Sequence, residues 1–461
     1  MTRKRKIGVI HPYWSFWESA VGPDFPENRR VLGQRAVETL ETLVDVAWSQ
    51  TVQPGDDIPA LLSALHVAEQ SGENPGIDAI VVASTMASSP GALIDVLNAY
   101  PTTPVVLWAA HDGLAVDPNL SHSGITERGG TVGIPMVGAH LTRIGRPYDV
   151  VASDVADVSA IGPAVIAATA AGAVRRSRLG VIGEPIPGYE WARIPSPMLE
   201  RIGITVVERE PEELASRLSA TSSDRSPLEG FTIDAAVADD DLDRALKYSS
   251  ALTDLVTDEQ LDAGTLNCHV PALRLGIGSA PCLALGACTS RGVPWTCTGD
   301  VATALAMLIV ASLGAPTLYH EIEALDEVTN EAILANSGEH DARFRAIGEK
   351  RIITNPWFDT DPGTTSAEFT LAPGPASLVA VATRNDGTLV AVVAPGHFTE
   401  RTSHASGTAN AAFVFSSGPI AEAWRRWSLA GVGHHSCATD RDVSREVEAM
   451  CRHLGMGFVQ V

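Results

Sequence analysis

The stretch AIVVAS at residues 79–84 carries no charged side chain and is rich in β-branched residues. Two further stretches, IGVI at 7–10 and VVLWA at 105–109, are similarly apolar. Segments with helical periodicity separate them, at 28–43 and 91–98. Strands that are apolar throughout and alternate with helices are typical of a parallel sheet covered on both faces. The pattern therefore predicts a doubly wound α/β domain, which we place at residues 1–170.

A second parallel-sheet domain of the same type is predicted over residues 171–312. Strand-like runs at 178–183 and 204–207 flank a helical segment that ends near residue 202. The predicted domain ends with the apolar run ALAMLIVA at 304–311. Because this run extends to only about a dozen residues and about 20 are needed to span a bilayer, it predicts a buried helix.

The pattern changes from about residue 365, where short apolar runs such as SLVAVA at 377–382 and LVAVV at 389–393 follow one another. The turn sequence NDG at 385–387 separates these two runs, and Asp-Gly between β runs is a strong hairpin signal. We predict a small antiparallel β barrel or sandwich, placed at 313–461 as a β-barrel-like domain, with a closing helix at 442–453.

The chain has 461 residues, 55 acidic and 33 basic, which gives a net charge of −22. At about 100–200 residues per domain, this length predicts two to four domains. The strong acidity argues against binding to nucleic acid or to an anionic membrane surface, because both need a basic footprint.

Six cysteines without a C-x-x-C motif indicate neither a disulfide framework nor a cysteine-based zinc site. Buried, reduced thiols in the cytoplasm are the expected state. The basic N-terminus is not followed by the apolar core of a signal peptide, so secretion is not expected.

An aromatic segment, HPYWSFWE at 11–18, follows the first predicted strand. Tyr13, Trp14 and Trp17 would therefore lie at the carboxyl edge of the sheet, where ligands bind in parallel α/β folds. The segment could equally pack against a neighbouring domain or subunit. No G-x-G-x-x-G follows a strand, so the dinucleotide-binding fingerprint is absent.

Residues whose side chains could take part in catalysis or metal binding are concentrated between 265 and 345 and at GVGHHS, residues 431–436. Side chains of adjacent residues in an extended segment point oppositely, so one of His434 and His435 is expected to face a given site. An oxygen ligand such as Glu321 with one imidazole would suit Mn²⁺ or Mg²⁺. The spacing matches no short-range metal motif, and core or surface histidines are also consistent with it.

At these residues the chain resembles the L-fucose isomerase / L-arabinose isomerase superfamily. Residues 294–308 look like the family's acidic segment and the helix after it, and 316–322 like the segment that delivers a second carboxylate. Asn-Ser-Gly-Glu-His at 336–340 is close to the Asn-Ser-Gly-Gln-His of fucose isomerases. Residues 431–436 are similar to the Gly-Gly-Ala-His-His-Thr of arabinose isomerases, and 13–18 lie where the family has an aromatic segment.

The resemblance implies a cytoplasmic aldose–ketose isomerase, usually Mn²⁺-dependent, with two α/β domains and a C-terminal β barrel. It also implies a homo-oligomer, a trimer or hexamer, with sites at subunit junctions. Glu321 would be a metal ligand and acid/base group, and His434 or His435 the metal-binding imidazole. The candidate site residues are Glu321, Asp300 and His320 for catalysis; Glu321, His434 and His435 for metal; and Tyr13, Trp14, Trp17, Asn267, His269, Thr298, Asn336 and His340 for substrate.

The chain departs from the family at Thr298, where the family has its first glutamate, two residues before Asp300. Asn336 stands where arabinose isomerases have a further histidine, as it does in fucose isomerases. Moving a proton between adjacent carbons needs a base near the carbon and an electrophile on the oxygens. The residues that could supply the missing group are Asp300, His320, Glu323, His269 and His340.

We therefore predict a divalent-metal-dependent sugar isomerase or epimerase that uses Mn²⁺, Mg²⁺ or another divalent ion. Its partners would be a small sugar or sugar derivative and other copies of the chain. Two alternatives stay open: a metal-dependent lyase or hydrolase acting on a sugar derivative, and a sugar-binding relative without catalytic activity.

Overall fold

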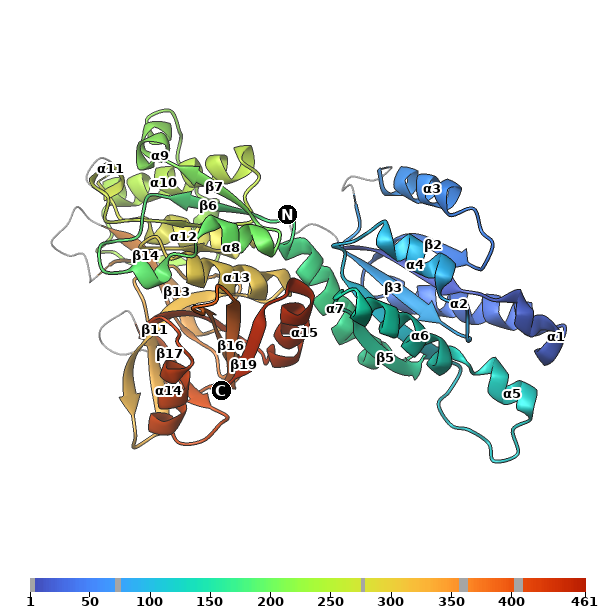
Figure 1. Cartoon of the computed structure of the whole chain (residues 1–461). Coiled ribbons are helices and arrows are strands. Elements are labelled where there is room, and N and C mark those ends of the chain that lie inside the picture. Colours follow the sequence, from blue (N-terminus) through green and yellow to red (C-terminus); the bar gives the residue numbers. More distant parts are fainter. Residues whose placement is uncertain (1–4, 71–75, 275–277, 356–363, 402–408) are drawn as a thin grey trace. The chain divides into compact units, whose positions relative to one another are not determined.

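The computed structural model describes residues 5–70, 76–274, 278–355, 364–401 and 409–461 (Figure 1). The chain divides into two compact units. The N-terminal unit runs to Ala173 and includes Glu448–Gly455, whereas the C-terminal unit comprises Val174–Val447 and Met456–Val461. The segments predicted as separate domains, 171–312 and 313–461, both fall largely in the C-terminal unit, and their separation stays a prediction.

A parallel five-stranded sheet forms the centre of the N-terminal unit, in the order β2-β1-β3-β4-β5. Its strands are β1 (Lys6–Pro12), β2 (Asp45–Val52), β3 (Ala79–Ser84), β4 (Val105–His111) and β5 (Asp149–Asp154). The helices of this unit are α1 (Glu18–Val21), α2 (Phe25–Glu41), α3 (Ile58–Gln70), α4 (Gly91–Asn98), α5 (His122–Glu127), α6 (Gly130–Arg143) and α7 (Val158–Val174), with a 3-10 turn η1 (Ser15–Trp17). The doubly wound architecture is confirmed.

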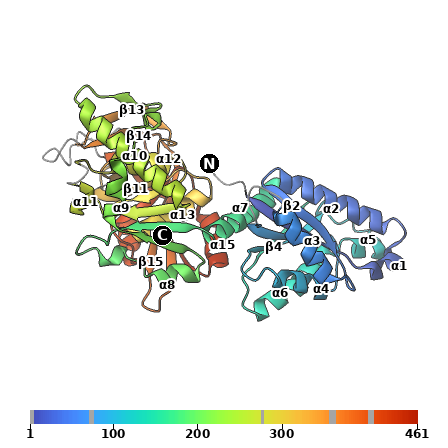
Figure 2. The same cartoon turned by 90° about the horizontal axis from the view of Figure 1, so that it is seen from above.

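Each face of this sheet has its own apolar core. Ala36 of α2 and Ile161 of α7 belong to one cluster of buried residues. Leu65 of α3, Leu93 of α4 and Ile134 of α6 belong to the other. The helices therefore cover both faces (Figures 1 and 2), as continuous apolar strands require.

The sequence pattern gives no prediction for β2 and β5, the two edge strands of the sheet. Both are partly exposed along their length, whereas β3 and β4 are buried throughout. An edge strand tolerates polar side chains, so neither carries the continuous apolar run that identifies the central strands.

The C-terminal unit contains a second parallel sheet, in the order β10-β9-β6-β7. Its strands are β6 (Arg178–Ile182), β7 (Thr205–Arg209), β9 (Ala263–Leu266) and β10 (Trp295–Thr296). The accompanying helices are α8 (Ser196–Arg201), α9 (Pro211–Leu218), α10 (Asp239–Asp258), α11 (Pro271–Arg274), α12 (Cys282–Ser290) and α13 (Val301–Ser312), with 3-10 turns η2 (Glu190–Ala192) and η3 (Ser226–Leu228).

Helix α13 is the apolar helix that the run at 304–311 predicts, and its first ten residues are all buried. It contacts β9 and β10 of the parallel sheet, and β15 and β18 of the next sheet. Burial on all sides explains its uniformly apolar sequence. Within the described part of the chain, no helix is long and apolar enough to cross a membrane.

The last sheet is a closed barrel of six antiparallel strands, in the order β15-β18-β11-β12-β17-β16, with β16 pairing back to β15. The strands are β11 (Leu318–Asp326), β12 (Glu331–Ala335), β15 (Gly374–Thr383), β16 (Leu389–Phe398), β17 (Ala409–Phe415) and β18 (His435–Thr439). Strand β19 (Gly457–Gln460) pairs with β16 in parallel. The barrel prediction is confirmed, and a sandwich is excluded because the sheet closes.

The remaining elements complete the C-terminal part. Strands β8 (Thr232–Ile233), β13 (Ala346–Thr354) and β14 (Thr365–Leu371) form a small separate sheet. Helix α14 (Ile420–Leu429) precedes β18. Helix α15 (Ser444–Leu454) lies where the helix at 442–453 is predicted, and its residues from Glu448 onward belong to the N-terminal unit. The turn between β15 and β16 contains Gly387 at a φ of 79°, as the Asp-Gly signal predicts.

Gly8 on β1 offers a test of the packing in the N-terminal unit. It lies opposite Trp48 of β2, and a Cβ at Gly8 would come within 2.1 Å of the indole ring. The ring cannot move away freely, because it is buried and its Nε1 donates to Glu69 at 2.9 Å. We expect Gly8→Ala to lower the free energy of unfolding by about 1–3 kcal/mol, measured by urea denaturation.

Gly91→Ala is the matched control, because a Cβ there meets nothing within 4 Å. It should leave the stability nearly unchanged. Equal stability of the two variants would contradict this account of the Gly8–Trp48 contact.

Candidate functional site

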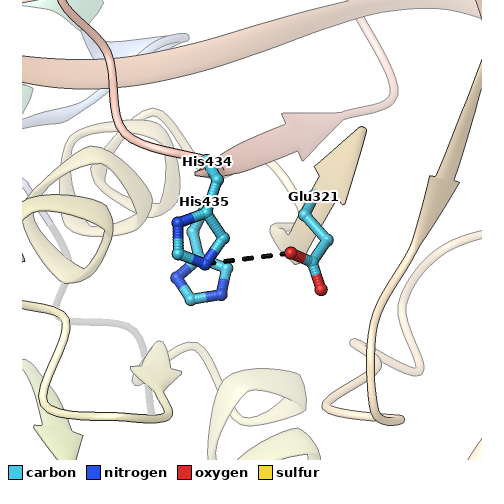
Figure 3. A group of neighbouring side chains, drawn as sticks. All are labelled: Glu321, His434 and His435. Carbon is cyan, nitrogen blue, oxygen red and sulfur yellow. Dashed lines mark ion pairs between the residues drawn. The ribbon is translucent and has the colours of Figure 1, made fainter. Parts of the chain in front are cut away.

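Three side chains from the barrel converge in the C-terminal unit (Figure 3). Glu321 lies on β11 and pairs with His435 on β18, while His434 directly precedes β18. One potential ligand atom from each of the three lies within 4.8 Å of the others. Among the described residues, no other group of three His, Cys, Asp or Glu side chains meets this criterion for a metal site.

The buried carboxylate of Asp300 holds His435 in place. Oδ2 of Asp300 lies 3.0 Å from Nδ1 of His435, and the hydroxyl of Tyr319 lies 2.6 Å from the same nitrogen. With the carboxylate as acceptor, Nδ1 carries the ring hydrogen and Nε2 presents its lone pair. Histidines that bind metals commonly have such a carboxylate behind the other nitrogen.

The same carboxylate caps α13. Asp300 is the N-cap residue and accepts from the backbone N and the hydroxyl of Thr303 at 2.9 and 2.8 Å. Asp300 is therefore fully buried, and its carboxylate lies next to Nδ1 of His435. This position makes it a positioning residue in the structure, while the predicted catalytic role stays a prediction.

Both histidines turn toward Glu321, contrary to the expectation that only one would. Their ring centroids are 3.9 Å apart, and Nε2 of His434 lies 3.8 Å from Oε2 of Glu321. Strand alternation does not apply to the pair because β18 begins at His435, so His434 does not follow strand geometry. His434 and Glu321 are partly exposed and His435 is buried, so the group is open on one side.

Burial sets the charge of these donors. It lowers the pKa of His434 to about 4, and the neighbouring His435 acts in the same direction. It also raises the pKa of Glu321, and the neighbouring Glu323 adds to this effect while His435 opposes it. At neutral pH the His434 imidazole is therefore neutral and its lone pair is available to a cation.

Two aromatic residues that the sequence analysis did not single out stand beside the histidines. Tyr189 and Trp191 lie in the segment after β6, each with its ring centroid 5.0 Å from that of His434. Gly433 makes the close approach possible, since a Cβ there would lie 1.9 Å from the Trp191 ring. Ligands bind at the carboxyl edge of the sheet in parallel α/β folds, which is why Tyr13 after β1 was predicted to contact substrate. The same reasoning applies to Tyr189, which follows β6.

Glu339 is a second residue that the sequence analysis did not select. It is 1% exposed, and neither carboxylate oxygen has a hydrogen-bond partner that meets standard geometry among the described residues. Burial raises its pKa to about 8, and the charges of Cys268 and Glu321 add to this, against a weak contact with the Cys282 thiol. Glu339 is therefore a neutral acid at pH 7. The available signal was its position, where the resembling segment of fucose isomerases has glutamine.

His320 is not brought together with Glu321. It lies on the opposite face of β11, fully buried, with Nε2 3.1 Å from the Ser436 hydroxyl. Burial lowers its pKa to about 3. Strand alternation places Tyr319 and Glu321 toward His435 and turns His320 away from them.

Thr298 and Asn267 lie at the carboxyl ends of β10 and β9. Thr298 has a φ of 61°, unusual for a β-branched residue, and its hydroxyl donates to the Cys297 carbonyl at 2.7 Å. Asn267 donates to the Glu184 carbonyl at 2.6 Å and accepts from the backbone N of His269 at 3.0 Å. His269 itself is exposed. Thr298 also lies 3.4 Å from the Tyr319 hydroxyl, which connects it to His435.

Asn336 and His340 follow β12 and are both buried. Oδ1 of Asn336 accepts from the Ser337 backbone at 2.6 Å, while its Nδ2 has no partner among the residues described. His340 packs edge-on against Phe369, with ring centroids 5.2 Å apart, and burial lowers its pKa to about 4. Their predicted contact with substrate stays a prediction.

Tyr13, Trp14 and Trp17 belong to the N-terminal unit. Trp14 stacks on Phe16 with centroids 5.0 Å apart, and Trp17 donates to the Ala87 carbonyl at 2.8 Å. Tyr13 donates to Glu18 at 2.9 Å and lines a cavity of about 480 Å³ at the end of β1. Their predicted role in substrate binding stays a prediction.

No protein-family model and no curated protein matches the chain. Among solved structures, one match is the "Structure of A-type Ketoreductases from Modular Polyketide Synthase", at 14% identity and a TM-score of 0.16. The match covers 64% of this chain and 78% of that one. A likeness this low carries no argument about fold or activity.

The raised pKa of Glu339 predicts a pH dependence of stability. Between its ordinary value of 4.5 and about 8, glutamate ionises in the unfolded chain while folded Glu339 keeps its proton. The unfolded state then binds fewer protons, so Glu339 makes the folded state progressively less stable as pH rises. Glu339→Gln removes this contribution and should gain stability relative to wild type by up to about 1.4 kcal/mol per pH unit.

Urea unfolding at pH 5, 6, 7 and 8 measures this difference. Glu327→Gln, an exposed change on the turn after β11, is the control and should parallel wild type. A Glu339→Gln curve that also parallels wild type would contradict the neutral state of Glu339.

Proposed function

We propose that the chain is a divalent-metal-dependent isomerase or epimerase of a small sugar or sugar derivative. The observation that carries the proposal is the convergence of Glu321, His434 and His435, with the Nδ1 of His435 held by Asp300. The resemblance to fucose and arabinose isomerases at 316–322 and 431–436 points to the same residues.

The donor set fits a first-row divalent cation. One carboxylate and two imidazoles favour Mn²⁺ or a similar ion over Mg²⁺, which prefers oxygen ligands and bound water. Nε2 of His435 is free to bind because its Nδ1 is occupied, and His434 is neutral at pH 7. When bound, such a cation would act as a Lewis acid on adjacent substrate oxygens.

The chain's own residues would divide the remaining work. Burial raises the pKa of Glu321, which makes its carboxylate a better proton acceptor for the substrate carbon. Glu339 keeps a proton at pH 7 and supplies a second carboxyl group, which interacts electrostatically with Glu321 and with Cys297, the residue before Thr298. An aldose–ketose isomerase needs one group that accepts a proton and one group that donates a proton.

Tyr189 and Trp191 supply the apolar side of the site. Their rings lie against His434 at 5.0 Å, next to the partly exposed Glu321. Aromatic walls with a few convergent polar groups are typical of small-molecule sites. A polyhydroxylated substrate would place its C–H face on these rings and its oxygens toward Glu321 and the histidines.

We also propose, from the resemblance, that the protein acts in the cytoplasm as a homo-trimer or homo-hexamer. Light scattering of the purified protein measures the mass directly. A monomer of 48.5 kDa at all concentrations tested would contradict the oligomer.

Titration of the metal-free protein with MnCl₂ by calorimetry tests the donor set. We expect one site per chain, lost in Glu321→Gln because the negative oxygen ligand is gone. Asp300→Asn should weaken binding by roughly 10–100-fold, since it removes the carboxylate behind His435. Glu327→Gln is the control and should bind like wild type. Equal binding by Glu321→Gln and wild type would contradict the site.

Proton transfer can be tested without knowing the sugar. Incubation of the Mn²⁺ protein with a panel of aldoses, ketoses and sugar acids in D₂O should incorporate deuterium at the carbon next to a carbonyl, detected by NMR. Glu321→Gln should abolish the exchange. Cleavage products without exchange would favour the lyase or hydrolase alternative, and thermal stabilisation by a sugar without any turnover would favour the sugar-binding alternative.

A further inference from the structure

Two cysteines meet at the edge of the parallel sheet, beside the candidate site. Cys268 follows β9 and Cys297 follows β10, which are paired neighbours with Thr296 opposite Thr265. Their sulfur atoms are 2.7 Å apart. Neighbouring strands lie about 4.8 Å apart, which is within the Cα separation that a disulfide bridges without large backbone movement.

The two sulfurs differ in their chemistry. The Cys297 thiol donates to Cys268, which lowers the pKa of Cys268 to about 5, and a contact with His269 lowers it further against the effect of burial. The same hydrogen bond and burial raise the pKa of Cys297. Cys268 is therefore the more acidic of the two thiols and the one that more readily forms a thiolate, which is the form that reacts with oxidants. Burial raises the pKa of Cys288 to about 11, which makes that thiol unreactive.

The pair is connected to the candidate site through the backbone of Cys297. Its carbonyl accepts from the Thr298 hydroxyl at 2.7 Å and from the Tyr319 hydroxyl at 3.4 Å. Tyr319 contacts Nδ1 of His435, and Asp300 lies three residues after Cys297. Thr298 and Gly299 hold the intervening backbone at φ values of 61° and 78°. A movement of Cys297 therefore reaches the groups that position His435.

We propose that Cys268 and Cys297 are a redox-modification site, where a peroxide converts the two thiols to a disulfide that alters the candidate metal site. The Cys268 thiolate attacks one peroxide oxygen, the O–O bond breaks, and a sulfenic acid and hydroxide form. Cys297 then attacks the Cys268 sulfur, the S–S bond forms, and the sulfenic oxygen leaves as water with the Cys297 proton. Peroxide gains the two electrons that the sulfurs lose, and a dithiol reductant reverses the reaction.

Peptide mapping of the full chain tests the disulfide. After treatment with H₂O₂, alkylation of the remaining thiols and digestion without reductant, mass spectrometry should detect a Cys268–Cys297 linked peptide that dithiothreitol removes. Cys288→Ser is the matched control and should keep the linkage. In Cys297→Ser, dimedone should instead trap the sulfenic acid on Cys268. Absence of the linked peptide from wild type, or linkage of another pair, would overturn the proposal.

Calorimetric Mn²⁺ titration of the oxidised and reduced protein tests the effect on the site. This arm rests on the proposed function, whereas the disulfide itself does not. We expect oxidation to weaken Mn²⁺ binding at least tenfold, with recovery after dithiothreitol. Equal affinity in both states would overturn the coupling to the site. Failure of the reduced protein to bind Mn²⁺ would overturn the proposed function. The disulfide would still stand or fall by the detection of the Cys268–Cys297 linked peptide.

Discussion

The buried carboxylate of Asp300 is the group on which the candidate site depends. Removing a carboxylate from water is costly, and hydrogen bonds from the backbone and hydroxyl of Thr303 and from His435 offset that cost. Because Thr303 lies on α13 and His435 on β18, one side chain joins the central helix to the barrel. The Thr296 hydroxyl also donates to the Asp300 carbonyl at 2.7 Å, which anchors the segment to β10. The orientation of His435 thus follows from packing that the fold requires in any case.

Much of the architecture could be predicted from the sequence, because segments that are buried in the fold carry long apolar runs that are easy to recognise. The run at 304–311 is apolar on every side because α13 lies between the parallel sheet and the barrel. The turn at 385–387 predicted the β15–β16 hairpin because a glycine is needed where φ is positive. The strands β2 and β5 could not be predicted in this way, because edge strands are only partly buried and lack a continuous apolar run.

The site was predictable only in part. Glu321, His434 and His435 were chosen because short segments resemble a known family, and the register of β11 against β18 brings them together. Periodicity would have excluded one of His434 and His435, because the start of β18 cannot be located to one residue from sequence. Tyr189 and Trp191 were missed because their importance depends on the barrel packing against the loop after β6. Glu339 gave no signal by composition, since its neutral charge arises from burial that the folded chain creates.

In the function that we propose, Glu321, His434 and His435 bind one divalent cation. The most direct measurement is an anomalous difference map from crystals grown with MnCl₂, recorded on either side of the manganese absorption edge. If these three residues bind the cation, the map shows one strong peak per chain in contact with the Glu321 carboxylate and the Nε2 atoms of His434 and His435. A map with no peak there, or with manganese bound only elsewhere on the chain, would contradict it.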